Sequence, residues 1–434
     1  MDKNISNKVP NGRWLHIIPP TILVYIVAYM DRTNIGFAMA GGMDKSLGMT
    51  ATISGLAAGI FFFGYMFLQI PGGKIAEKGS AKKFIAWTIL GWGGFAIISG
   101  FVQNVWQLLA IRFLLGVAEG GVWPAILTII SHWFPNEERG RANAFFMMNL
   151  AIAAIITGPL SGWIISVYNW RMVFIIEGII SLALMFIWLP LMSDRPEDAK
   201  WISQEEKDYI NTKLREEQEA LRKSEGEKVS IGEILKNINM WKLILIYFCY
   251  QTGIYGFSLW LPTLLKTLTR SGMAGVGLLS VFPYIGTIIG LYIFGTRSDK
   301  SGNRKLYTGI PLIGFSICLL LSVQFKSQVW VSFAFLIGCG VFFQAASSVF
   351  WTIPPMLFSA EAAGGARGVI NALGNLGGFL GPYLVGWLTY RYSSSAGIYS
   401  LVVILALGFL LTMTLPAKTA GKTHGESVEV AEEV

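Results

Sequence analysis

Long apolar runs, separated by short polar stretches, dominate the pattern of hydrophobic and polar positions along this chain of 434 residues. A helix that crosses a bilayer needs roughly 20 consecutive, mostly apolar residues. Twelve runs reach about that length, so the pattern predicts an all-α polytopic membrane protein with twelve transmembrane helices. The predicted spans cover residues 14–38, 52–72, 83–102, 106–130, 142–166, 171–192, 241–262, 275–296, 306–325, 329–352, 367–388 and 397–416.

The composition agrees with this fold class, because 53% of the residues are hydrophobic and only 14% are charged, which is not the balance of a soluble domain. No small-residue cleavage site follows the first apolar run, so we expect it to be a retained helix rather than a removed signal peptide. Cys249, Cys318 and Cys339 lie within predicted spans without a CxxC pair, which favours packing roles. No metal site and no cofactor are predicted.

The net charge of +8 is explained by membrane topology. If the N-terminus lies inside and the loops alternate, inner segments hold 26 of the 34 Lys and Arg residues and outer segments hold six. The positive-inside rule then predicts that both termini are cytoplasmic, in a plasma (inner) membrane. The lipid bilayer, and not a nucleic acid, is therefore the expected partner, and we expect a monomer.

The two halves of the chain repeat each other. The stretch GKIAEKGSAKK (73–83) follows the second predicted span, and GTRSDKSGNRK (295–305) follows the eighth, at an offset of 222 residues. Duplicated six-helix halves are typical of transporters with a substrate site between the halves. In the polar stretch between them, Ser203 and Glu206 have the spacing of a capping box. The predicted organisation is an N-terminal half (1–192), a cytoplasmic linker (193–240), a C-terminal half (241–416) and a cytoplasmic tail (417–434).

The repeated loops resemble the GxxxDKxGxRK loop motif of the major facilitator superfamily. The second copy matches more closely, because the first has Glu77 in place of Asp and Ser80 in place of Gly. The resemblance implies a fold of two pseudo-symmetric six-helix halves, with loops that latch the halves together through acid–base contacts. The loop residues to which it gives this conformational role are Gly73, Glu77, Lys78, Gly295, Asp299, Lys300 and Arg304.

Five further stretches resemble the anion:cation symporter family within this superfamily. Bacterial members of that family take up sugar acids, tartrate, phthalate and hydroxyphenylacetate. The likeness is most specific in the first, second, fourth and fifth predicted spans. The stretches are YMDRTNIGFA (29–38), FFFGYMFLQIPGGKIA (61–76), RFLLGVAEGGVWPA (112–125), HWFPNEERGRANAFF (132–146) and FWTIP (350–354).

Four charged residues lie well inside predicted spans: Asp31 and Arg32 in the first, and Arg112 and Glu119 in the fourth. An unpaired charge at a helix centre costs roughly 2.5–3.5 kcal/mol on insertion scales, so we expect these side chains to face a wet cavity or one another. Arg112 and Glu119 are two turns apart and share a helix face, as do Tyr29 and Arg32, whereas Asp31 is rotated by about 100° from Arg32. The alternative is two ion pairs that only lock the helices together.

These residue types fit the chemistry of an organic-anion carrier. A guanidinium group binds a carboxylate through paired donors, so Arg32 and Arg112 are the candidate anion ligands or sources of positive field. Proton coupling requires carboxyl groups whose proton affinity changes with their surroundings, and Asp31 and Glu119 are the candidates. The family resemblance implies the same roles, with the proton as the coupling ion.

The resemblance also implies substrate contacts outside this charged set. Gln251 is a weaker candidate because, like Asn149 and Tyr255, it also fits an ordinary interhelical hydrogen bond. Glu177 is expected to be structural, with Arg171 as its partner. Together with Tyr29, the candidate substrate contacts are Tyr65, Ser348, Trp351, Asn371 and Gln251.

The favoured substrate is a hydroxylated sugar acid, such as an aldonate, a hexuronate or a tartrate-like anion, because these polar groups suit hydroxyls better than a benzene ring. Ala58 and Tyr250 stand where the resemblance places the His and Arg of glutamate-type relatives, which argues against an acidic amino acid. An aromatic-acid symporter and a proton-coupled exporter of drugs or metabolites remain alternatives. A membrane-embedded enzyme is disfavoured, because His132, the histidine near an inward interface, has no clear catalytic partner.

Overall fold

The computed structural model describes residues 10–223, 231–358 and 360–416, and within these ranges it is helical without strands. Ten helical segments are long and apolar enough to cross a membrane, and they coincide with ten of the twelve predicted spans. The other two predicted spans coincide with α4 (Ala81–Ser99) and with α19 (Ala360–Gly374) followed by α20 (Leu376–Arg391). The predicted all-α fold is confirmed, and the predicted tail lies outside the described residues.

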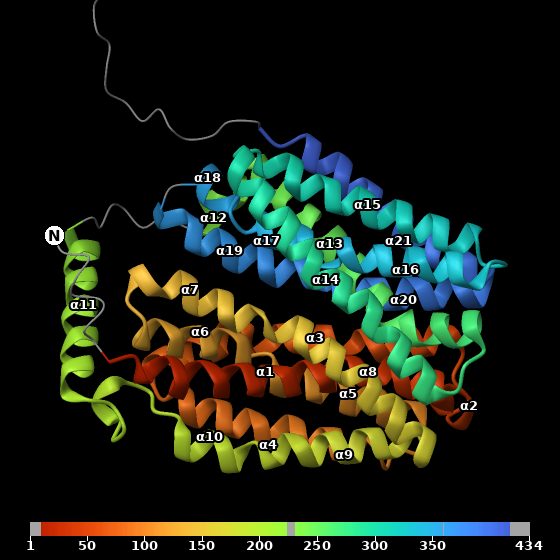
Figure 1. Cartoon of the computed structure of the whole chain (residues 1–434), viewed down its shortest axis with the longest axis horizontal. Helices are drawn as coiled ribbons and strands as arrows, with labels where there is room; N and C mark the ends of the chain where they lie inside the picture. Colours follow the sequence, from red (N-terminus) through yellow and green to blue (C-terminus); the bar gives the residue numbers. More distant parts are fainter. Residues whose placement is uncertain (1–9, 224–230, 359, 417–434) are drawn as a thin grey trace, which may run out of the picture.

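The helices form two bundles that lie side by side (Figure 1). Beside α4, the first bundle contains α1 (Gly12–Ala38), α3 (Ala51–Lys78), α5 (Val105–Glu119), α6 (Val122–Trp133), α7 (Asn136–Met147), α8 (Asn149–Val167), α9 (Trp170–Ala183) and α10 (Met185–Leu191). Beside α19 and α20, the second contains α13 (Ile238–Thr269), α14 (Met273–Ser301), α15 (Arg304–Gln324), α16 (Val329–Phe343), α17 (Ala345–Phe350), α18 (Pro354–Leu357) and α21 (Ser394–Met413). The short α2 (Asp44–Ser46) follows α1, and α11 (Gln204–Lys223) and α12 (Ile231–Lys236) lie between the bundles in the chain.

The fourth predicted span is a broken helix, made of α5 and α6 with Gly120 and Gly121 between them. A side chain at Gly120 would collide with the backbone of Tyr65 on α3. Small residues of this kind let two membrane helices approach closely. The close approach holds the end of α5, and with it Glu119, against α3.

The bundles are in close contact at the end that carries α2, which we call the α2 end. There α8 and α14 cross backbone to backbone, because a side chain at Gly158 would collide with Gly277 and Ser280. Lys266 of α13 also donates to the carbonyl oxygen of Ala40 at 2.5 Å. The opposite end carries α11 and α12, and we call it the linker end. Toward it the ribbons of the two bundles diverge (Figure 1).

The linker helix α11 docks on the first bundle through a buried ion cluster. The Arg13 guanidinium donates to Glu138 of α7 at 2.8 Å and to Glu206 of α11 at 2.7 Å, and Arg13 and Glu206 are each 1% exposed. Ser203 caps α11 as predicted, because its hydroxyl accepts from the Glu206 N–H at 3.2 Å. The Glu206 carboxylate does not complete the predicted capping box; it accepts from Arg13 and from the Gly12 N–H instead.

We expect Glu206→Gln to undock α11. Removing one partner of a buried ion pair costs roughly 3–5 kcal/mol, so protease cleavage within the linker should accelerate at least about tenfold. Limited proteolysis of the purified protein measures this rate. Glu216→Gln on the same helix is the matched control, because Glu216 is 62% exposed where it pairs with Lys213. Equal cleavage of the two variants would contradict a holding role for the buried cluster.

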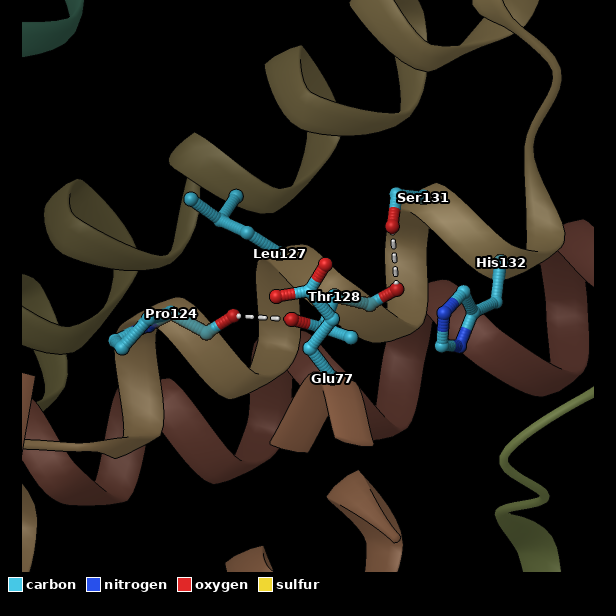
Figure 2. A pocket seen from close by; sticks show the side chains of 6 residues that line it. All are labelled: Glu77, Pro124, Leu127, Thr128, Ser131 and His132. Carbon is cyan, nitrogen blue, oxygen red and sulfur yellow. Dashed lines mark hydrogen bonds between the residues drawn. The ribbon is translucent and has the colours of Figure 1, made fainter. Parts of the chain in front are cut away.

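At the repeated loops, the ion pair found among the described residues lies within one bundle, and the acid–base latch between the halves stays a prediction. Arg304 pairs with Asp299 of its own loop at 2.5 Å, and the bundles diverge at this end. Glu77 of the first copy lines a cavity of about 350 Å³ together with Thr128 and His132 of α6 (Figure 2). The other loop residues lie near the C-terminal ends of α3 (Gly73 and Lys78) and α14 (Gly295 and Lys300).

Candidate functional site

Arg32 of α1 lies between the two bundles and forms an ion pair with Glu119 at the end of α5. Arg32 is 4% exposed and Glu119 is fully buried. The same guanidinium donates to the hydroxyl of Tyr255, on α13 of the second bundle, at 3.3 Å. A single cation therefore contacts an acid from one half of the molecule and a hydroxyl from the other.

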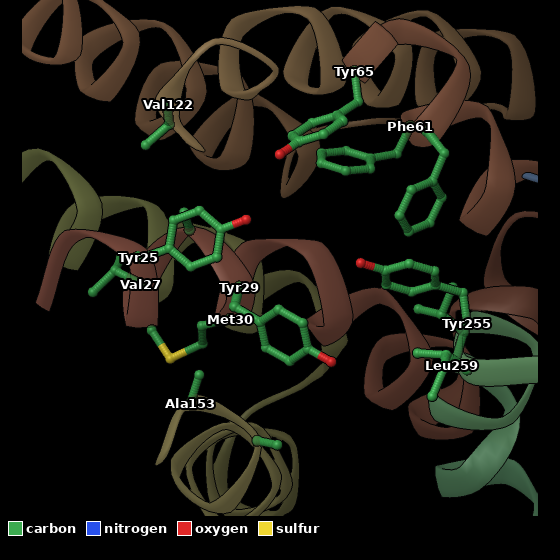
Figure 3. Close-up of a cluster of buried hydrophobic side chains, with 14 of the residues drawn as sticks. Tyr25, Val27, Tyr29, Met30, Phe61, Tyr65, Val122, Ala153, Tyr255 and Leu259 are labelled. Carbon is green, nitrogen blue, oxygen red and sulfur yellow. The ribbon is translucent and has the colours of Figure 1, made fainter. Parts of the chain in front are cut away.

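Aromatic rings surround this guanidinium. The Arg32 Cζ atom lies 4.7 Å from the ring centroid of Tyr65 and 5.4 Å from that of Phe61. The rings of Tyr25 and Tyr29 follow at 5.8 and 5.9 Å. Rings at these distances attract a cation through their negative faces. Figure 3 shows the hydroxyl groups of Tyr25, Tyr65 and Tyr255 pointing into the space between α1, α3 and α13.

Two polar atoms of this site have no hydrogen-bond partner within the described structure: Oε2 of Glu119 and Nε of Arg32. Both belong to buried side chains. Buried polar groups are nearly always hydrogen-bonded in native proteins, and each exception calls for an explanation. A ligand carboxylate satisfies a guanidinium Nε.

Arg112 shares its helix with Glu119, but its hydrogen bonds go to the backbone of other helices. Its guanidinium donates to the backbone carbonyl oxygens of Asp31, Arg32 and Ala57 at 3.2, 3.4 and 3.5 Å. Glu119 pairs across helices with Arg32 instead. Arg112 thus supports the α1 backbone at the position where the candidate anion ligand and proton carrier stand next to each other.

Asp31 points away from Arg32, toward α9. Its carboxylate accepts from the Ser181 hydroxyl at 2.6 Å. Near it, Glu177 accepts from the Ser161 hydroxyl at 2.7 Å. The expected pairing of Glu177 with Arg171 is wrong, because the Arg171 guanidinium donates to backbone carbonyls of the α4–α5 loop.

The amides of the second half form a chain that reaches into the first. Gln251 donates to Asn375 at 2.6 Å, Asn375 donates to Asn371 at 3.2 Å, and Asn371 donates to Gln69 of α3 at 3.0 Å. Sequence reasoning found Gln251 and Asn371 but missed Asn375 and Gln69. The signal for Asn375 was its position one helical turn after Asn371.

Two other predicted substrate contacts, Ser348 and Trp351, lie outside both the Arg32 site and the amide chain. Ser348 is exposed, and its hydroxyl donates to the Ala345 carbonyl at 2.8 Å. The Trp351 ring packs against Tyr247, with centroids 4.9 Å apart. The structure thus brings together Tyr29, Tyr65, Arg32 and Glu119, and it gathers Gln251 and Asn371 in the amide chain. Tyr25, Phe61 and Ser181 are site residues that the sequence reasoning missed.

Comparisons with known proteins identify the family. A family model described as Major Facilitator Superfamily matches residues 21–382 and 271–431. A putative tartrate transporter from Agrobacterium vitis is 31% identical over 99% of each chain. A quinolone resistance transporter from Acinetobacter baumannii is 32% identical over 93% of each chain. Among solved structures, a bacterial homologue of the human lysosomal transporter Spinster, inward-facing and unoccupied, has a TM-score of 0.73 at 17% identity, and the match covers 93% of this chain and 98% of that chain.

The fold and its polar site between two helical bundles are those of a multi-pass membrane transporter. The chain belongs to the Major Facilitator Superfamily. The predictions of the superfamily, of its fold and of a transporter rather than an enzyme are confirmed.

Proposed function

We propose that this transporter takes up a small organic anion together with protons by alternating access, and that the anion is a hydroxylated sugar acid or a tartrate-like acid. The observation that carries the proposal is the position of Arg32, a buried cation that contacts Glu119 of one bundle and Tyr255 of the other. A carboxylate that leaves water needs such a cation. Binding sites of transporters with repeated halves lie at this interface.

In this mechanism the anion binds by replacing Glu119 as the partner of Arg32. When Glu119 takes up a proton, it loses its charge and its attraction for the guanidinium. The carboxylate of the anion then takes its place and accepts the paired N–H donors. The buried charge is unchanged, because the anion replaces the charge that the proton removed. Loss of the proton from Glu119 restores the ion pair and expels the anion.

The remaining polar groups select the substrate. The hydroxyl groups of Tyr25, Tyr65 and Tyr255 point into the space beside Arg32 (Figure 3). These groups donate to and accept from substrate hydroxyls, which favours a hydroxylated acid over an aromatic one. Asp31 is the second proposed proton carrier, and Arg112 holds the backbone that positions it.

The conformation suits the end of an uptake cycle. In the predicted topology the linker end faces the cytoplasm, so the bundles meet on the outer side and diverge toward the inside. The Arg32–Glu119 ion pair is then the state in which the anion and the proton of Glu119 have both left.

The relatives favour two transport directions. Similarity to a putative tartrate transporter supports uptake of a hydroxylated acid. Similarity to a quinolone resistance transporter supports the second candidate, a proton-coupled exporter. The pairing of the central acid with an arginine favours an anionic substrate, because an exporter of cations needs an acid that is free of such a partner.

Ligand screening followed by flux measurement tests the proposal. The screen covers aldonates, uronates, tartrate and aromatic acids, with a quinolone beside them, and we expect one of these acids, but not the quinolone, to raise the unfolding temperature of the purified protein. A ligand at 100 times its Kd stabilises the folded state by about 2.7 kcal/mol. In proteoliposomes an inward proton gradient should concentrate that acid, and a protonophore should abolish the accumulation. Stabilisation by a quinolone alone, with flux opposite to the proton gradient, would establish the exporter instead.

A further inference from the structure

Asp31 and Glu177 form a second acidic group on the side of α1 that faces α8 and α9. Asp31 is 1% exposed and Glu177 is fully buried. The Asn34 side-chain nitrogen donates to Glu177 at 2.9 Å and lies 3.5 Å from the Asp31 carboxylate, so one amide bridges both acids. The Ser181 hydroxyl joins Asp31 to the backbone carbonyl of Glu177. This group is separate from the aromatic surroundings of Arg32.

The buried charges of the first bundle do not balance. Away from the α11 docking cluster, the buried charged side chains of the described residues are three acids, Asp31, Glu119 and Glu177, and two bases, Arg32 and Arg112. With every group ionised, the interior would carry one uncompensated negative charge. An uncompensated buried charge costs roughly 3–5 kcal/mol. One bound proton removes it.

The neighbouring charges indicate which acids hold that proton. Glu119 is ion-paired with Arg32 and so is ionised in this conformation. Arg112 of α5 donates to the backbone carbonyl oxygen of Asp31 and not to the Asp31 carboxylate. On α9, Arg171 donates to carbonyls of the α4–α5 loop. The sequences of α8 and α10 contain no charged residue, and α4 carries its lysines, Lys82 and Lys83, near its N-terminal end.

The bridging amide gives a second indication. Asn34 is 1% exposed, and its Oδ1 atom has no hydrogen-bond partner within the described structure. Two ionised carboxylates offer acceptors only, so they leave this oxygen unsatisfied. A protonated carboxyl group adds one O–H donor to this cluster.

We infer that Asp31 and Glu177 together bind one proton, at a site distinct from the anion site at Arg32. Asn34 and Ser181 link the two acids, so that the proton resides on one carboxyl group or the other within a single hydrogen-bonded cluster. Glu177 is therefore a proton-binding residue and not only a structural one. The part that this proton plays in transport rests on the proposed proton coupling.

Infrared spectroscopy of the purified protein tests this site without substrate. The wild type at pH 7 should contain the carbonyl-stretch band of one protonated, buried carboxylic acid. Glu177→Gln and Asp31→Asn should each abolish the band, because either change leaves the remaining buried charges balanced. Glu137→Gln is the control, because Glu137 is 70% exposed, and it should keep the band.

Any other pattern overturns the inference. A wild type without the band has no such proton, and a band that survives in either single variant belongs to one acid or lies elsewhere. Ser181→Ala serves if the acid variants do not fold: loss of the hydroxyl at 2.6 Å from Asp31 should shift the band. An unshifted band would place the proton outside this pair. Because no gradient is used, failure of the proposed transport mechanism leaves this measurement interpretable.

Discussion

Arg32→Gln should abolish binding of the transported acid, and Arg32→Lys should restore little of it. Truncating one partner of a buried, hydrogen-bonded charge pair costs roughly 2–5 kcal/mol, which corresponds to a rise in Kd between about 30-fold and several thousand-fold. Lysine keeps the charge but lacks the planar fork that holds a carboxylate with two donors. Calorimetric titration of the purified variants with the acid found by ligand screening measures the loss.

A double variant separates lost binding from lost folding. Arg32→Gln alone leaves Glu119 buried without its cation, which by itself destabilises the protein. Arg32→Gln combined with Glu119→Gln removes both charges and should recover the unfolding temperature without recovering binding. Wild-type affinity in the double variant would mean that another group, with Arg112 the first candidate, holds the anion.

The membrane spans and the repeated halves were predictable because they depend on local properties of the chain. A run of apolar residues long enough to cross a bilayer needs no knowledge of its neighbours. The close approach of α5 to α3 at Gly120 was not predicted, because it depends on the Tyr65 backbone of another helix, which leaves no room for a side chain.

The partners of the buried charges were only partly predictable. Helical spacing placed Arg112 and Glu119 on one face correctly, but it gave no information about which helix that face meets. The structure turns Glu119 to Arg32, 87 residues earlier in the chain. Spacing also separated Asp31 from Arg32, and the structure places them on different sides of α1, toward α9 and α5.

The surroundings of Glu177 show why the partners of a buried acid cannot be predicted from the residues near it in the sequence. Within its own span, Arg171 is the nearest base, and the pairing looked natural. The groups that bind the carboxylate are Ser161 of α8 and Asn34 of α1, the latter 143 residues away. Uncharged partners from other helices leave no signal near an acid in the sequence.

Glu119→Gln should uncouple the transporter without preventing it from carrying its substrate. Glutamine has the shape of a protonated glutamic acid and no charge, so it leaves Arg32 free for the anion at any pH. Exchange of labelled for unlabelled acid across proteoliposomes at equal pH should therefore persist. Accumulation under an imposed proton gradient should fall to the level seen without a gradient, because residue 119 can no longer bind and release the proton that controls anion binding at Arg32.

The comparison of these two fluxes decides the role of Glu119. Glu137→Gln is the matched control, because Glu137 is 70% exposed and pairs with Lys213 at 3.4 Å, and both fluxes should remain. Gradient-driven accumulation at the wild-type level in Glu119→Gln would exclude this residue as the proton carrier. Loss of exchange together with accumulation would instead mean that Glu119 holds the anion site in shape. If exchange persists and gradient-driven accumulation is lost, proton binding at Glu119 is coupled to anion binding at Arg32.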